Sequence, residues 1–133
     1  TVHTSGSTPT GTYTLTITAT SGTLTHTTQV TLAVADFSMS VSPSSQTVSK
    51  NSSTTYTVTV SALGPFTASV TFTAGGLPGG TSASFSPATV AGSGASTLTV
   101  SAGQNAGGGN HSLNVTATGG GLTHFANVNL VIQ

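Results

Sequence analysis

The amino-acid sequence predicts an all-β protein, folded as an antiparallel sandwich of about seven strands with an additional β-hairpin in front of it. Along most of the chain, apolar residues alternate with Thr and Ser, and Gly or Pro interrupts the alternation at short intervals. This pattern is typical of half-buried strands joined by tight turns. No segment shows the 3.6-residue periodicity of an amphipathic helix. The third observation is an internal repeat, which divides the chain into two units.

One stretch of the chain occurs twice. Residues 11–34 (GTYTLTITATSGTLTHTTQVTLAV) and residues 109–132 (GNHSLNVTATGGGLTHFANVNLVI) are identical at 11 of 24 positions, without a gap, at an offset of 98 residues. A period near one hundred residues is that of a small β domain. The chain is therefore expected to contain the last third of one repeat, residues 1–35, followed by a complete repeat, residues 36–133.

Each copy of the repeated stretch predicts a β-hairpin. In the first copy, Tyr13, Leu15 and Ile17 alternate with Thr, and the alternation resumes after Ser21-Gly22. A two-residue loop at Ser21-Gly22 pairs residue 19 with 24 and residue 17 with 26. This pairing keeps the apolar residues of both strands on one face.

The complete repeat consists of short apolar runs separated by Gly and Pro. The first run ends at Pro43 and continues briefly to Val48, and a turn is expected over residues 50–53. The expected strands of the repeat carry Phe37, Met39 and Val41; Tyr56, Val58 and Val60; Val70 and Phe72; Ala83 and Phe85; Leu98 and Val100; and the hairpin 109–132. The breaks between them fall at residues 64–65, 75–80 and 103–109 and at Pro87.

The start of the chain and the junction between the two units have their own pattern. Thr1-Val2 aligns with Thr99-Val100, so we expect the chain to begin inside a strand, as a processed or partial product, and to continue through a Ser/Gly/Pro loop. Only Ala35-Asp36 separate the last strand of the first unit from the first strand of the second. Two residues are too few for a flexible tether. We therefore expect the units to abut at a restricted angle and to form a stiff rod.

The composition excludes several functional classes. Lys50 and Asp36 are the only basic and acidic residues besides four His, so the basic surface that binds nucleic acid or anionic membranes is missing. No apolar run approaches the ~20 residues of a membrane-spanning helix, and no membrane insertion is expected. Cys is absent, which excludes disulfides and thiol chemistry. Thr and Ser supply 49 of 133 residues, and a hydroxyl-rich, nearly uncharged surface favours association or sugar attachment outside the cell.

The first hairpin is expected to need a partner, because an isolated two-stranded hairpin is marginally stable in water. An upstream segment or a neighbouring molecule would complete it: the hairpin could occupy a slot shaped for residues 109–132, or extend a sheet edge. The expected partner is therefore another copy of the chain or an adjacent repeat. The candidate assembly surface comprises the apolar residues of this hairpin, which are Tyr13, Leu15, Ile17, Leu24, Val30, Leu32 and Val34.

No catalytic, cofactor or metal site is predicted. The four histidines are His3, His26, His111 and His124. The register of the second hairpin places His111 opposite Leu130 and His124 opposite Ala117, about 20 Å apart along the ladder. No carboxylate is expected nearby to complete a metal site. Asp36 is the only acidic side chain, so the carboxylate pair of a general acid–base enzyme is missing.

Several positions are candidates for sugar attachment. Asn51, Asn110 and Asn114 begin Asn-x-Ser/Thr triplets, which are acceptors of N-linked glycans but also arise by chance in Ser/Thr-rich chains. Thr8 and Thr10 flank Pro9 and are candidates for O-linked sugar. Glycans are therefore retained as candidate partners.

The strand motifs FSMSVSP, TYTVTV, FTASVTFTAGGLPGGTSASFSP, STLTV and NHSLNVTATGGGLTHFANVNLVI, in this order, resemble the immunoglobulin-like repeats found in tandem on secreted and surface proteins of bacteria. The resemblance covers residues 36–132, and again 11–34. It implies an extracellular or cell-surface structural protein that forms a stalk or a filament assembled by strand complementation. It also implies a tyrosine corner, which Gly11-x-Tyr13-x-Leu15 matches, while the second copy has His111 at the Tyr position.

A second function remains open beside the structural one. Repeats of this kind also occur as carbohydrate-binding or spacer modules of secreted hydrolases and adhesins. Sugar-binding surfaces usually present exposed aromatic rings, and this chain has no Trp. Phe66 and Phe125 are the only candidate exposed rings for such a surface.

Overall fold

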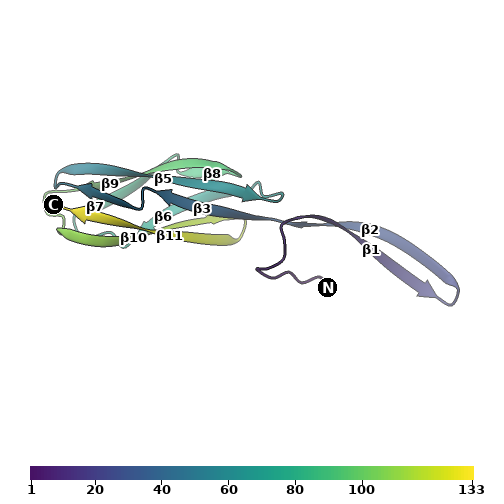
Figure 1. Cartoon of the computed structure of the whole chain (residues 1–133). Helices are drawn as coiled ribbons and strands as arrows, with labels where there is room; N and C mark the ends of the chain where they lie inside the picture. The colour runs from purple at the N-terminus through teal and green to yellow at the C-terminus, as the bar shows by residue number, and fades with distance from the viewer.

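The computed structural model describes all 133 residues. It contains eleven β-strands and no helix (Figure 1). The strands form a two-stranded hairpin, a sheet of four strands and a sheet of five strands. The two larger sheets lie within residues 36–133, which we call the two-sheet body, and the hairpin extends from one end of this body (Figure 1). The prediction of an all-β chain is confirmed. None of the chain forms a helix that could cross a membrane.

The hairpin consists of β1 (Gly11–Ser21) and β2 (Leu24–Val34). Its predicted loop is wrong: the loop is Gly22-Thr23, and Ala19 pairs with His26 rather than with residue 24. Gly22 has a φ of 60°, which glycine adopts without strain, so the turn begins there and Ser21 still pairs with Leu24. Because the register shifts by two residues, the set of side chains on each face is unchanged.

The first sheet of the body has four antiparallel strands in the order β3-β5-β9-β7. Their bounds are β3 (Asp36–Ser42), β5 (Ser52–Leu63), β7 (Thr81–Ser86) and β9 (Gly94–Ala102). Each of them contains one of the predicted apolar runs. Thr and Ser occupy the alternate positions that face solvent, as β-branched and small polar residues commonly do on the open face of a sheet.

The second sheet of the body has five strands in the order β4-β11-β10-β6-β8. Their bounds are β4 (Ser45–Val48), β6 (Ser69–Gly75), β8 (Thr89–Ala91), β10 (Gly109–Gly119) and β11 (Leu122–Ile132). The body thus has nine strands rather than about seven. The fully antiparallel prediction is wrong at one pair, because β4 crosses to this sheet and pairs in parallel with β11.

A single apolar core lies between the two sheets of the body. It contains nineteen buried apolar residues, and none of them comes from residues 1–35. Among the fully buried residues, Phe37, Tyr56, Val58, Leu98 and Val100 belong to the four-stranded sheet, and Val70, Leu113, Val115 and Leu130 to the five-stranded sheet. The Tyr56 hydroxyl donates a hydrogen bond of 2.8 Å to the backbone oxygen of Asn129 and so links the sheets. Burial raises the pKa of Tyr56 above its ordinary value, because it disfavours the phenolate.

The hairpin and the body are joined by one residue, Ala35, between the end of β2 and the start of β3. Gly64, at the end of β5, lies against this joint with a φ of 61°. A Cβ at Gly64 would approach the carbonyl oxygen of Val34 to 2.8 Å and the backbone nitrogen of Gly11 to 3.0 Å. Glycine therefore lets β5 pack closely against the base of the hairpin. The expected strand end at Thr1-Val2 is wrong, since residues 1–10 contain no strand and the Val2 side chain is exposed.

Candidate assembly interface

The seven candidate assembly residues lie on one face of the β1–β2 hairpin. In its register Tyr13 pairs with Leu32 and Leu15 pairs with Val30, and side chains of directly paired residues share a face. Ala19, His26 and Thr28 occupy the same face, whereas the Thr residues of β1 point to the other. We call this surface the hairpin apolar face. No strand of the chain covers it: Ile17 is 53% and Leu24 66% exposed.

Five of the seven equivalent residues of the second copy are buried, and the other two, His111 and Leu122, are half-buried. Val115, at the position of Ile17, is 0% exposed, and Val128, at the position of Val30, is 3% exposed. The difference arises because the four-stranded sheet covers β10–β11, and no sheet covers β1–β2. Two nearly equivalent sequences therefore occupy opposite environments. The exposed apolar strip is therefore particular to the first copy.

Both edges of the hairpin also lack partners. In the body, residues 114–118 of β10 pair with β6, and residues 129–132 of β11 pair with β4. The equivalent segments of the hairpin are residues 16–20 of β1 and residues 31–34 of β2. Each of these strands pairs only with the other. Unpaired strand edges of this kind are templates for pairing with another chain segment.

A corner hydrogen bond anchors the first strand of each hairpin. The Tyr13 hydroxyl donates to the backbone oxygen of Pro9, four residues upstream, at 2.9 Å. His111 makes the equivalent contact, with Nε2 2.9 Å from the backbone oxygen of Gly107. A carbonyl oxygen only accepts hydrogen bonds, so Nε2 carries the proton in this contact. Histidine thus replaces tyrosine at the corner of the body and keeps the corner hydrogen bond, which the sequence comparison of the two copies did not reveal.

An acidic side chain and a histidine meet beside the joint. Asp36 Oδ1 lies 2.8 Å from His124 Nε2, and the Phe37 ring packs edge-on against the imidazole at a centroid distance of 4.6 Å. The expectation that no carboxylate lies near His124 is therefore wrong, because β3 and β11 bring together residues that are 88 positions apart. The hydrogen bond from His124, and then that from the Phe37 backbone N–H, hold the pKa of Asp36 below its ordinary value.

This contact predicts a small dependence of stability on acid. A carboxyl group with a lowered folded-state pKa stabilises the fold above its unfolded value of about 3.9, and this stabilisation is lost as the pH falls through the folded-state value. Both side chains are 37% exposed, so solvent screening limits the loss to less than about 1 kcal/mol. We expect urea midpoints at pH 5 and pH 2.5 to differ less in Asp36→Asn than in the unmodified chain. An equal difference in both chains would contradict this role of Asp36.

The candidate glycosylation positions lie in different environments. Asn51 is exposed in the turn between β4 and β5, with a φ of 59°, and Asn110 is exposed at the start of β10. Asn114 is half-buried, and its amide donates to Asn127 Oδ1 at 2.9 Å. Thr10 is exposed, whereas the Thr8 hydroxyl accepts a hydrogen bond from the Ser5 backbone N–H. Asn51, Asn110 and Thr10 are therefore the candidates most accessible to an enzyme that attaches sugar.

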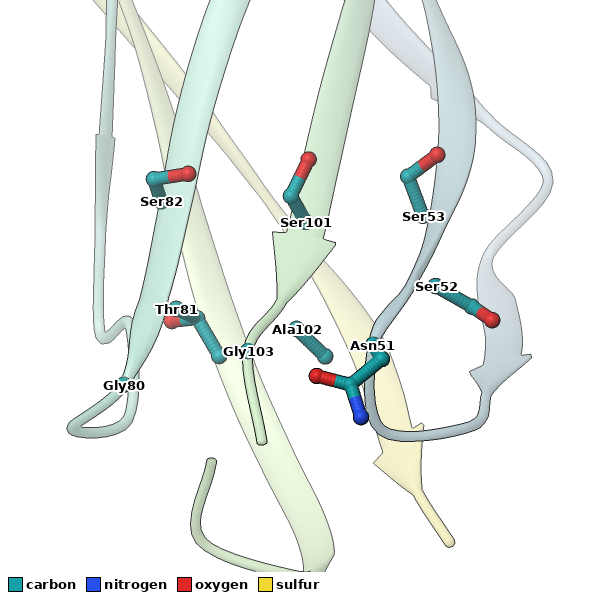
Figure 2. A pocket seen from close by; sticks show the side chains of 9 residues that line it. All are labelled: Asn51, Ser52, Ser53, Gly80, Thr81, Ser82, Ser101, Ala102 and Gly103. Carbon is teal, nitrogen blue, oxygen red and sulfur yellow. The ribbon is translucent and has the colours of Figure 1, made fainter. Parts of the chain in front are cut away.

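The larger of two cavities is an open groove of about 540 Å³ at the end of the four-stranded sheet farthest from the hairpin (Figure 2). Ser53, Ser101 and Ser82 are directly paired across β5, β9 and β7, and they form a row along one side of the groove (Figure 2). Ala102 is the only apolar residue that lines it, and no charged side chain does. Such a lining gives no basis for assigning a ligand.

The structure also places the aromatic residues that a sugar-binding surface would need. Phe66 is 6% exposed and packs against Phe37 at a centroid distance of 5.1 Å, so the expectation that it is an exposed ring is wrong. Phe125 is 69% exposed on β11. No cluster of three or more potential metal-ligating side chains is present. Of the two expected rings, only Phe125 is therefore exposed.

Comparison with known proteins gives matches at the level of structure only. No family model and no curated protein matches the chain. A crystal structure of domains 4 and 5 of the S-layer protein SbsC matches 90% of this chain, with a TM-score of 0.54 and 22% identity. The fold is shared with S-layer protein domains. A longer SbsC structure matches 91% of the chain, with a TM-score of 0.55 and 22% identity.

The chain spans only part of these S-layer proteins: 57% of the two-domain structure and 16% of the longer one. An endo-fucoidan hydrolase of glycoside hydrolase family 107 also matches, at 14% identity and a TM-score of 0.46. A likeness this weak carries no argument about function. Identities near 22% likewise show a common fold and no more.

Proposed function

We propose that this chain is a structural module of an extracellular or cell-surface assembly of bacteria. Residues 36–133 are one complete immunoglobulin-like repeat, and residues 1–35 are the last third of another, as the repeat at an offset of 98 residues supports. The facing sheets and the corner bonds of Tyr13 and His111 fit this type of domain. The fold shared with S-layer protein domains is consistent with the same role.

The observation that carries the proposal is the uncovered hairpin apolar face. A module that worked alone would gain nothing from Ile17, Leu24 and Val30 in water, whereas a module within an array buries them against a neighbour. The chain also has almost no charge to keep copies apart. Strand complementation between neighbouring modules then produces a stalk or a filament, because a head-to-tail contact does not close on itself.

We expect the purified chain to associate by packing the hairpin apolar faces of two copies against each other, because the two-sheet body of each copy already pairs with its own second hairpin. Light scattering at micromolar concentrations should give a mass above that of the 12.9 kDa monomer, increasing with concentration. Ile17→Thr combined with Val30→Thr keeps the strand propensity but removes apolar surface, so association should weaken about tenfold or more. Thr16→Ser, on the opposite face, is the matched control and should change nothing. A monomer at all concentrations, with an ordered hairpin, would contradict the proposal.

The second candidate function is that of a carbohydrate-binding or spacer module of a secreted hydrolase or adhesin. One observation favours it, namely the exposed ring of Phe125 on β11. A glycan array with the unmodified chain and with Phe125→Ala separates the two functions. Binding that is lost in Phe125→Ala would support the sugar-binding role, and the absence of binding in both chains leaves the structural role.

A further inference from the structure

We propose that the β1–β2 hairpin is the docking site for a chain segment with the strand pattern of residues 36–98, and that this segment brings a carboxylate to His26. The inference rests on the proposed function and names the partner of the same surface. The proposed docking is more specific than a general apolar contact, because the surroundings of the second copy of the repeat show which groups the partner must carry. Three features of the hairpin point to this occupant: its edges, the surroundings of His26 and the steric environment of Ser21.

Pairing of both free edges of the hairpin requires two further strands, one antiparallel and one parallel. In the body, β6 runs antiparallel to β10 and pairs with residues 114–118, while β4 runs parallel to β11 and pairs with residues 129–132. At an offset of 98, the partner supplies an antiparallel strand along residues 16–20 and a parallel strand along residues 31–34. Val2 corresponds to Val100, which is fully buried within β9, and is itself 58% exposed. Pairing of residues 1–4 with the docked segment would bury Val2 in the same way.

In the docked hairpin, the acidic partner of His26 must come from the docked segment, because this chain has no second acidic side chain. Its counterpart His124 contacts Asp36 at 2.8 Å and the Phe37 ring. His26 lies on the hairpin apolar face opposite Ala19, with no acidic or aromatic residue among its cross-strand pairs. Asp36 is the only acidic side chain in the sequence, and it is already bound to His124. A partner with an Asp–Phe pair at the start of its first strand, as in residues 36–37, would supply both groups.

The complete body of a second copy does not offer this site. Its β4 and β6 already pair with its own β11 and β10. Exchange of hairpins between copies would also place Ser21 at the position of Gly119. A Cβ at Gly119 would lie 2.7 Å from the carbonyl oxygen of Ser69 and 3.0 Å from a Val70 methyl carbon, closer than such atoms approach. The occupant is therefore a segment whose strands equivalent to β4 and β6 are not already paired with a hairpin. It must also leave room for the Ser21 side chain.

The test adds such a segment to the full chain. A second copy of residues 36–98 is placed directly before Thr1, and Ser21→Gly removes the clash with the added Ser69. Hydrogen exchange at residues 16–20 and 31–34 should slow by at least about 100-fold relative to the Ser21→Gly chain without the added segment. Amides of β10–β11 report that the original body is intact. Equal exchange in the two chains, with β10–β11 protected, would overturn the inference.

Two variants of the extended chain test its details. Asp36→Asn in the added segment should shift the ¹⁵N resonance of His26 Nε2, and an unchanged resonance would overturn the acid assignment. Restoring Ser21 should reduce the protection at residues 16–20, whereas full protection would overturn the steric argument. The inference is separable from the proposed function, because it fails or succeeds on hydrogen exchange within one chain. The proposed function is judged by association of the 133-residue chain.

Discussion

Replacing Leu113 by Ala is expected to lower the free energy of unfolding of the two-sheet body by about 2–5 kcal/mol, because the substitution leaves a cavity in a closely packed core. Leu113 is fully buried on β10. Leu15 occupies the same position of the repeat on β1, but it is only half-buried and lies outside the core. Leu15→Ala should change the stability of the body by less than about 0.5 kcal/mol.

The two leucines form a matched pair, because they have the same side chain and the same position in the repeated stretch. Urea unfolding followed through Tyr56 measures the effect, in a Tyr13→Phe background so that only one tyrosine reports. Equal losses for the two substitutions would mean that the hairpin and the body unfold as one unit. That result would contradict the separate environments of the two copies.

Replacing Gly76 by Ala is expected to destabilise the body by about 2–5 kcal/mol. Gly76 follows β6 with a φ of 75°, in the left-handed region that costs other residues about 1–2 kcal/mol. A Cβ there would also collide with the carbonyl oxygen of Ser112 on β10. Relief of that contact requires the β6 end to move away from β10, and overpacking of this kind costs about 1–3 kcal/mol more.

Gly75 provides the control for this substitution. It is adjacent in sequence, has no positive φ, and a Cβ there would meet only the carbonyl oxygen of Asn114 at an ordinary 3.8 Å. Gly75→Ala should therefore change the urea midpoint by less than a quarter of the change caused by Gly76→Ala. Similar midpoints for the two variants would show that β6 and β10 yield easily at this end, against the close approach described here.

Local pattern was sufficient to predict most of the strands. Alternation along residues 109–132 predicted β10 and β11. It also predicted the cross-strand pair of Ala117 with His124. The loop of the first hairpin was misplaced because Ser21 and Thr23 are both acceptable in a turn, and only the positive φ of Gly22 selects the register. β8 was missed because a three-residue strand with two adjacent apolar residues, Val90 and Ala91, gives no periodicity.

The features that depend on tertiary structure were not accessible from pattern. β4 appeared as a continuation of β3, although Pro43 ends that strand and the chain crosses to pair with β11 in the other sheet. Phe66 is one of the two rings that the sequence offers as exposed, yet it packs on Phe37. The Asp36–His124 contact joins residues 88 positions apart. One signal pointed to it: the single acid of the chain stands at the joint, and the histidine occurs in both copies of the repeat.

The single-residue joint determines how tension would pass through the molecule. β2 continues into β3 through Ala35, while the C-terminus lies at the opposite end of the body (Figure 1). A pull between these two points draws β3 and β11 lengthwise in opposite directions. The seven residue pairs of β3 with β5 and the four pairs of β11 with β4 are then sheared together, not peeled apart one after another. A chain of such units would therefore resist stretching along its length.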